Sequence, residues 1–136
     1  MLRLLLAVAA VYGLWFVTDI VIHCLILGSV YETQTAVFYP AAEMKMGLVQ
    51  LVVLANAAVF TKIYSWFISP KNLKTGVVYG ALYGFAHGFG MGFGTYATMR
   101  ITLATAWTWT LGAIVQAILA GVVVSLIIHQ RDDKPL

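Results

Sequence analysis

The feature that most constrains this chain is a series of four long apolar stretches. They run from about Leu4 to Gly28, Met46 to Phe67, Thr75 to Thr98 and Leu103 to Ile128. Each is long enough to cross a hydrocarbon core of about 30 Å, which requires about 20 helical residues. The stretches are continuous rather than alternating, and only helices or closed barrels satisfy their backbone groups in lipid. The sequence therefore predicts an all-α polytopic membrane protein, a four-helix transmembrane bundle forming a single domain over residues 1–136.

The composition agrees with a membrane protein and disfavours several other classes. Hydrophobic residues make up 62% of the chain and charged residues 10%, whereas soluble domains have about 45–50% and about 25%. No basic cluster suggests nucleic acid as a partner. There is no phosphate loop, no cysteine pair and no recognisable serine–histidine–acid set, so the sequence leans away from an enzyme. The expected partners are the lipid bilayer and other membrane subunits or further copies of this chain.

The positive charges predict an orientation. With the amino terminus inside, the inner side carries six Lys and Arg residues: Arg3, Lys62, Lys71, Lys74, Arg131 and Lys134. The outer side carries only Lys45 and Arg100. Because Lys and Arg accumulate in cytoplasmic loops, both termini are expected in the cytoplasm of a multi-pass protein.

Short similarities between the two halves suggest a tandem repeat of two helical hairpins. Val11-Tyr12-Gly13 in the first stretch resembles Val78-Tyr79-Gly80 in the third, and Gly47–Gln50 resembles Ile114–Gln116 at nearly the same offset. The two halves would then share one orientation, as a parallel repeat. Chance matches are common in membrane sequences, so the repeat and the chance interpretation both stay open.

Small residues at a spacing of four predict close helix packing. Glycines recur in the third stretch, and small residues do so in the fourth: Gly80, Gly84, Gly88 and Gly92, then Ala113, Ala117 and Gly121. Residues four apart share a helix face, and such faces let helix backbones approach closely. Tight packing within the protein or between copies is one interpretation of the glycine face. A slot for a planar cofactor or a lipid tail is the other.

Polar residues fall near the middle of each apolar stretch: Asp19, Asn56, His87 and Gln116. A charged aspartate at the bilayer centre costs about 2.5–3.5 kcal/mol, so these groups should turn inward and pair. Asp19 and His87 are the expected couple. The cluster is either a buried polar clasp that fixes helix register or a site for a proton or ligand. His23 lies one turn beyond Asp19 on the same face.

A metal or haem site has weaker support. Asp19 and His23 have the spacing of two ligands on one helix face, but a metal requires further ligands. His23 and His87 would differ in depth by roughly 6–9 Å, which argues against a haem between them. No metal and no cofactor is therefore predicted.

Several short motifs resemble a family of small bacterial inner-membrane proteins with four predicted spans and no assigned function. They are Asp19, Phe38-Tyr39, Gly80-Ala81-Leu82-Tyr83-Gly84, Tyr96-Ala97-Thr98 and Leu103-Ala104-Thr105. The family tends to carry an acidic residue just after Tyr-Ala-Thr, where this chain has Arg100. The resemblance implies a location in the bacterial inner membrane and the four-span topology, and it implies no chemistry.

Three functions remain open from the sequence. The favoured one is a non-enzymatic accessory or structural subunit that packs against other membrane proteins. The second is a small proton-coupled transporter with a midplane site at Asp19 and His87. The third is a membrane protein or enzyme that holds a haem, metal or pigment.

Overall fold

A computed structural model describes residues 1–129 as an all-helical chain without strands. Its elements are α1 (Leu2–Asp19), the π-helix η1 (Ile20–Ile26), α2 (Gly28–Thr33), the 3₁₀ turn η2 (Ala41–Glu43), α3 (Met46–Phe67), α4 (Leu73–Thr98) and α5 (Leu103–Ile127). The expected polar tail from Gln130, with its Arg131 and Lys134, lies outside the described residues.

Three of these helices are long and apolar enough to cross a membrane. They are the continuous helix Leu2–Ile26, then Met46–Phe67 and Leu103–Ile127, with mean hydropathies of 2.1, 1.7 and 2.3. The third expected span, α4, is helical over 26 residues but does not reach the same hydropathy. The reason is its composition, because seven of its residues are glycine: Gly76, Gly80, Gly84, Gly88, Gly90, Gly92 and Gly94.

Capping residues set the starts of α4 and α5. Asn72 caps α4, since its side chain accepts a hydrogen bond from the backbone N–H of Thr75 at 2.9 Å. The Thr75 hydroxyl lies 3.2 Å from the backbone N–H of Asn72, which completes a capping box. Thr102 caps α5 in the same way by accepting from the N–H of Thr105 at 3.1 Å. Each cap satisfies a donor that the first helical turn leaves unpaired.

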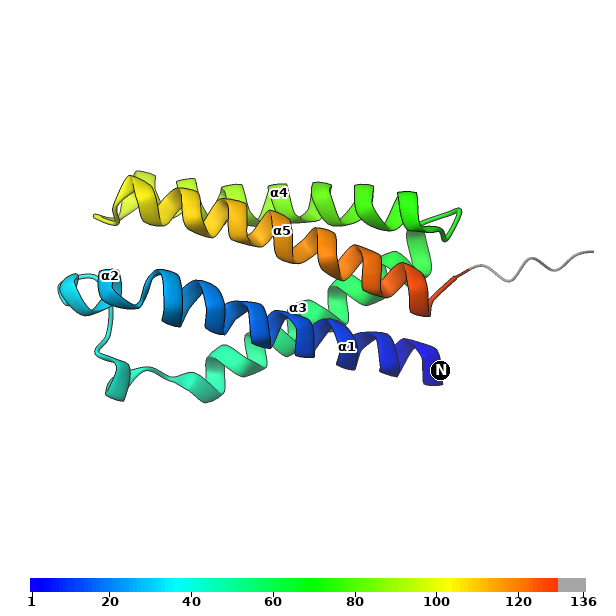
Figure 1. The fold of residues 1–136 in the computed structure, drawn as a ribbon, viewed down its shortest axis with the longest axis horizontal. Helices are drawn as coiled ribbons and strands as arrows, with labels where there is room; N and C mark the ends of the chain where they lie inside the picture. Colours follow the sequence, from blue (N-terminus) through cyan, green and yellow to red (C-terminus); the bar gives the residue numbers. More distant parts are fainter. Residues whose placement is uncertain (130–136) are drawn as a thin grey trace, which may run out of the picture.

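The helices pack in the spatial order α3, α1, α5, α4. α4 and α5 form a hairpin in contact along its whole length, while α1 lies against both α3 and α5 (Figure 1). At one end of the hairpin Gly76 lies against Gly121 and Ser125, and at the other Gly92 lies against Ala106 and Thr110. α1 and α3 are packed less closely, so the two hairpins of the suggested repeat differ in packing.

α3 and α4 meet at the end where the chain connects them. The Phe60 ring lies 4.6 Å from that of Tyr79 and 4.9 Å from that of Tyr83, measured between centroids. The Tyr79 hydroxyl donates to the buried carbonyl of Phe60 at 2.8 Å. Beyond this aromatic cluster the two helices diverge (Figure 1). Residues of both diverging parts, among them Val52 of α3 and Met91 of α4, line a common cavity.

Candidate functional site

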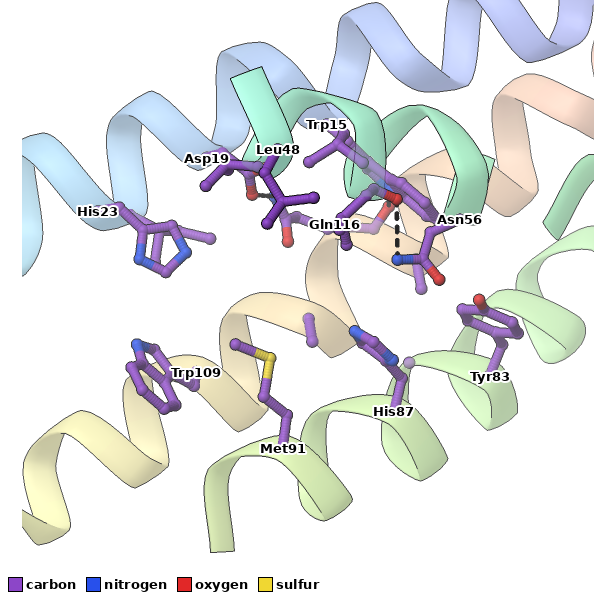
Figure 2. Close-up of a pocket in the computed structure, with 17 residues that line it drawn as sticks. Trp15, Asp19, His23, Leu48, Asn56, Tyr83, His87, Met91, Trp109 and Gln116 are labelled. Carbon is purple, nitrogen blue, oxygen red and sulfur yellow. Dashed lines mark hydrogen bonds between the residues drawn. The ribbon is translucent and has the colours of Figure 1, made fainter. Parts of the chain in front are cut away.

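The space between the helices contains a cavity of about 400 Å³. Its polar lining consists of one residue from each of five helical elements: Asp19 from α1, His23 from η1, Asn56 from α3, His87 from α4 and Gln116 from α5. Figure 2 shows these side chains around the same space. The structure thus places all five polar residues singled out from the sequence on one cavity, although they do not all touch one another.

Asp19 is bonded to Gln116. The Gln116 side-chain nitrogen donates to Asp19 Oδ1 at 2.7 Å and to the Thr18 hydroxyl at 2.6 Å. A side-chain amide has two N–H hydrogens, so this geometry uses both. Gln116 is near the middle of α5, and the hydrogen bond places the aspartate at the same depth.

Asp19 and His87 face a common cavity without a hydrogen bond between them among the described residues. His87 instead stacks on Tyr83 of its own helix, with ring centroids 6.1 Å apart and planes inclined by 20°. The prediction that Asp19 pairs with His87 assumed that the first and third apolar stretches are neighbours. In the structure α1 packs on α3 and α5, and α5 and the cavity separate it from α4.

The remaining two polar residues have other partners. The Asn56 side-chain nitrogen donates to the Val52 carbonyl of its own helix at 3.1 Å. His23 Nδ1 lies 2.7 Å from the hydroxyl of Tyr31, and the Trp109 indole N–H donates to the same hydroxyl at 2.8 Å. Tyr31 therefore joins η1 to α5 next to two residues that line the cavity, His23 and Trp109.

The hydrogen bonds around Tyr31 favour one arrangement of the His23 ring. Because the indole N–H can only donate, the Tyr31 oxygen is its acceptor and keeps its own hydrogen for another partner. If the Tyr31 hydroxyl donates that hydrogen to His23 Nδ1, the Tyr31 hydroxyl, the Trp109 N–H and His23 Nδ1 each have a hydrogen-bond partner. The neutral imidazole then carries its proton on Nε2, the ring nitrogen that Tyr31 leaves free on this cavity-lining side chain.

Aromatic side chains form much of the remaining wall, and the sequence did not single them out for this role. Trp15, Tyr83 and Trp109 line the cavity, and Met91 lies beside His87 (Figure 2). The sequence patterns also gave Trp109 and Tyr31 no role at this site. A signal was present for two of the lining aromatic residues, because Trp15 lies four residues before Asp19 and Tyr83 four residues before His87, and residues four apart share a helix face.

A π-helical segment follows Asp19 directly and carries His23. It spans Ile20–Ile26, and at its end the Leu27 N–H bonds to the Ile22 carbonyl five residues earlier at 3.0 Å. Such segments are rare and occur frequently at functional sites. Their wider turn changes the direction of side chains relative to an α-helix, and here it accompanies the hydrogen bond of His23 to Tyr31.

The glycine face of α4 is filled by α5. A methyl group on Gly84 would lie 2.7 Å from Ile114 Cα and 2.8 Å from the Ala113 carbonyl oxygen. One on Gly88 would lie 2.8 Å from Ala113 Cβ, and Gly80 lies against the backbone of Ala117. The interpretation of this face as a slot for a planar cofactor or lipid tail is therefore wrong, because the backbone of α5 occupies the space.

Within residues 1–129, no group of three or more His, Cys, Asp or Glu side chains has the geometry of a metal site. The chemistry of the cavity is that of one carboxylate, two imidazoles and two amides. Such a set can hold a proton, a cation or a hydrogen-bonding ligand, and it holds no aligned nucleophile and base.

The cavity opens between α3 and α4. Residues of both helices that line it are also exposed on the outside of the bundle, including Leu48 at 57%, Val52 at 50% and Met91 at 42%. The cavity is therefore reached from the side of the molecule where these residues of α3 and α4 are exposed.

Comparisons with protein-family models, curated proteins and solved structures find no match for this chain.

Proposed function

We propose that this chain is a four-span membrane protein that binds a small amphipathic molecule inside the bilayer, with Asp19 as the charged group of the site. The observation that carries the proposal is the shared cavity. Five separate helical elements each contribute one of these polar residues to it, and its lining residues on α3 and α4 are exposed. Its volume of about 400 Å³ lies in the range of small-molecule sites, about 300–1,000 Å³.

Packing supports α4 as the fourth span. Its 26 residues extend about 39 Å at 1.5 Å per residue, more than the hydrocarbon thickness. It lies against α5 from Gly76 to Gly92, and α5 is long and apolar enough to cross. A helix in contact with a membrane-spanning neighbour over its whole length spans the same thickness. The backbone contact with α5 also compensates for the low hydropathy of the glycines.

The charge distribution supports the proposed orientation. Arg3, Lys62, Lys71 and Lys74 lie at one end of the long helices, and Lys45 and Arg100 lie at the other. The excess of positive charge at the first end favours both termini in the cytoplasm. The resemblance noted above favours a bacterial inner membrane.

The free-energy cost of placing the Asp19 carboxylate inside a membrane supports a role beyond fixing the alignment of neighbouring helices. A carboxylate at this depth costs about 2.5–3.5 kcal/mol, whereas an interhelical hydrogen bond in a membrane returns about 0.6 kcal/mol on average. The one hydrogen bond that Gln116 donates to Asp19 therefore does not compensate for the charge. A cationic ligand or a proton bound at the carboxylate would compensate for this charge.

An accessory subunit remains the second candidate. It is favoured by the small amount of chain outside the helices, since α2, η2 and short loops are the main connections in residues 1–129. The glycine face of α4, which suggested contact with a partner protein, is already covered by α5 of the same chain. A partner would therefore have to dock on the exposed apolar surface of the bundle.

The test is ligand-dependent stabilisation of the purified protein in nanodiscs. A panel of amphipathic molecules of different charge is screened by thermal shift in the wild type, Val52→Trp and Leu51→Trp. Val52 lines the cavity mouth, while its neighbour Leu51 is 61% exposed and faces away from the cavity. A ligand at about 100 times its Kd stabilises by about 2.7 kcal/mol.

The proposal expects stabilisation of the wild type and Leu51→Trp, and none of Val52→Trp, in which the indole fills the cavity. If no molecule stabilises the wild type, or if Val52→Trp responds like Leu51→Trp, the cavity is not a binding site. Co-purification of a fixed protein partner would then favour the accessory subunit.

A further inference from the structure

The lining of the cavity contains one acidic residue and no Lys or Arg. Asp19 is the only Asp, Glu, Lys or Arg among the residues that line it. Its Oδ1 accepts from Gln116, whose second amide hydrogen goes to Thr18. Gln116 therefore has no further hydrogen for the other carboxylate oxygen, and that oxygen has no hydrogen-bond donor among the described residues. A carboxylate oxygen without a donor, on a residue that lines the cavity, is available for contact with a cation.

The aromatic walls suit a positively charged group. The indole N–H of Trp15 donates to the Gln116 carbonyl at 3.2 Å, and that of Trp109 donates to Tyr31. Since protein acceptors engage both N–H groups, the two indoles offer the cavity no free N–H donor, and carbon atoms of their rings line it. Aromatic rings of Trp and Tyr attract cations over their faces. The third aromatic wall, Tyr83, lies on the opposite helix (Figure 2).

The wall on the α3 side is apolar. Leu48, Val49, Val52 and Val53 cover the mouth of the cavity, and Asp19 lies across from them on α1. A molecule that enters from the lipid would meet this apolar wall first and the carboxylate second. An anion would meet the charge of Asp19 without any Lys or Arg to compensate it. A bare metal ion would leave most of about 400 Å³ unfilled.

We infer that the ligand of this cavity is a small organic cation with an apolar portion, an amine or quaternary ammonium, which reaches Asp19 from the bilayer between α3 and α4. The inference rests on the proposed function and adds the chemical class of the ligand. The cationic group contacts Asp19 and the aromatic rings, and the apolar portion lies against the valines of α3.

Three probes of nearly equal shape separate charge from size: benzyltrimethylammonium, its neutral carbon analogue neopentylbenzene, and the anion benzylsulfonate. Their Kd values are measured by thermal-shift titration of the full chain in nanodiscs at constant ionic strength. Empty nanodiscs give the correction for partition into lipid. The cation is expected to bind at least tenfold more tightly than either of the other two.

Asp19→Asn tests the carboxylate without removing its hydrogen bond, because the asparagine oxygen still accepts from Gln116. This variant is expected to lose the tenfold preference for the cation and to keep its affinity for neopentylbenzene. The matched control is Glu43→Gln, which removes a carboxylate of η2 outside the cavity. Its affinity for the cation should equal that of the wild type.

The outcomes distinguish the inference from the proposed function. If neopentylbenzene binds as tightly as the cation and Val52→Trp abolishes both, the cavity binds ligands and the inference of a cation is wrong. Equal cation affinity in the wild type and Asp19→Asn also overturns it. If none of the three probes binds, both the inference and the proposed function fail.

Discussion

Replacing Gly84 with alanine should loosen the α4–α5 hairpin, and Gly90→Ala provides a control on the same helix. A methyl group at Gly84 would lie 2.7 Å from Ile114 Cα, 2.8 Å from the Ala113 carbonyl oxygen and 2.9 Å from Ala117 Cβ. Two of these are backbone atoms and the third is the first atom of its side chain. None can move unless α5 moves. At Gly90 a methyl group meets nothing within 4 Å.

The expected magnitude follows from two opposing effects. Overpacking costs about 1–3 kcal/mol, and the three simultaneous contacts at Gly84 place it near the upper value. Removing a glycine from a helix interior returns about 1 kcal/mol. The net loss is about 2 kcal/mol, or a fall in Tm of about 8 °C for a chain of this size. Gly90→Ala introduces no close contact and only raises the helix propensity, so its Tm should equal or exceed that of the wild type.

Thermal unfolding of both variants in the same detergent, followed by circular dichroism, measures the difference. A Gly84→Ala protein that melts together with Gly90→Ala would refute the close approach of α5 to the glycine face. A fall in both variants by the same amount would show that helix flexibility, rather than contact with α5, is the role of the glycines.

Three further variants test individual hydrogen bonds. Gln116→Leu removes the donor to Asp19 and should cost about 1–3 kcal/mol, because a buried acceptor is left unpaired; an unchanged Tm would show that the bond is absent. Tyr79→Phe loses the bond to the Phe60 carbonyl and should cost about 0.6–1 kcal/mol in the same assay. Tyr31→Phe breaks the bridge between the imidazole and the indole and should lower Tm at pH 7. Burial raises the pKa of Tyr31 above its ordinary 10.0, so its contribution is complete below about pH 10 and is lost as the pH rises through the raised pKa. The difference in Tm between wild type and Tyr31→Phe should therefore shrink at alkaline pH, and a constant difference would contradict this.

The helices of this chain can be predicted from its sequence because their signal is local. Continuous apolar stretches indicate helices in lipid, and the α3 helix has the bounds, Met46–Phe67, of the second expected stretch. The proposed span α4 is a harder case. Glycines reduce the hydropathy of α4 while they allow it to pack on α5, so the residues that serve its packing weaken its membrane signal.

The partners of the polar residues could not be predicted from depth. Position along a helix gives the height of a side chain in the membrane and does not say which helices are neighbours. Asp19 and His87 have similar heights, but α1 lies against α5, and Gln116 is the residue within reach. Nothing in the sequence indicates the π-helix after Asp19 or the return of Tyr31 toward Trp109.

The most direct test of the shared cavity is the reactivity of single cysteines on α3. Cys24, the only native cysteine, is first replaced by serine. Asn56→Cys then places a thiol in the cavity, and Leu54→Cys places one on the outside of the same helix, where Leu54 is 44% exposed and does not line the cavity. N-ethylmaleimide reaches both through the lipid, but it reacts with the thiolate, which forms only where water is present.

A cavity of this size with five polar side chains in its lining admits water, whereas the outer face of α3 meets lipid. The cysteine at position 56 is therefore expected to react much faster than that at position 54, and bound benzyltrimethylammonium should slow its reaction. Equal rates at the two positions would contradict a polar cavity between α3 and α4.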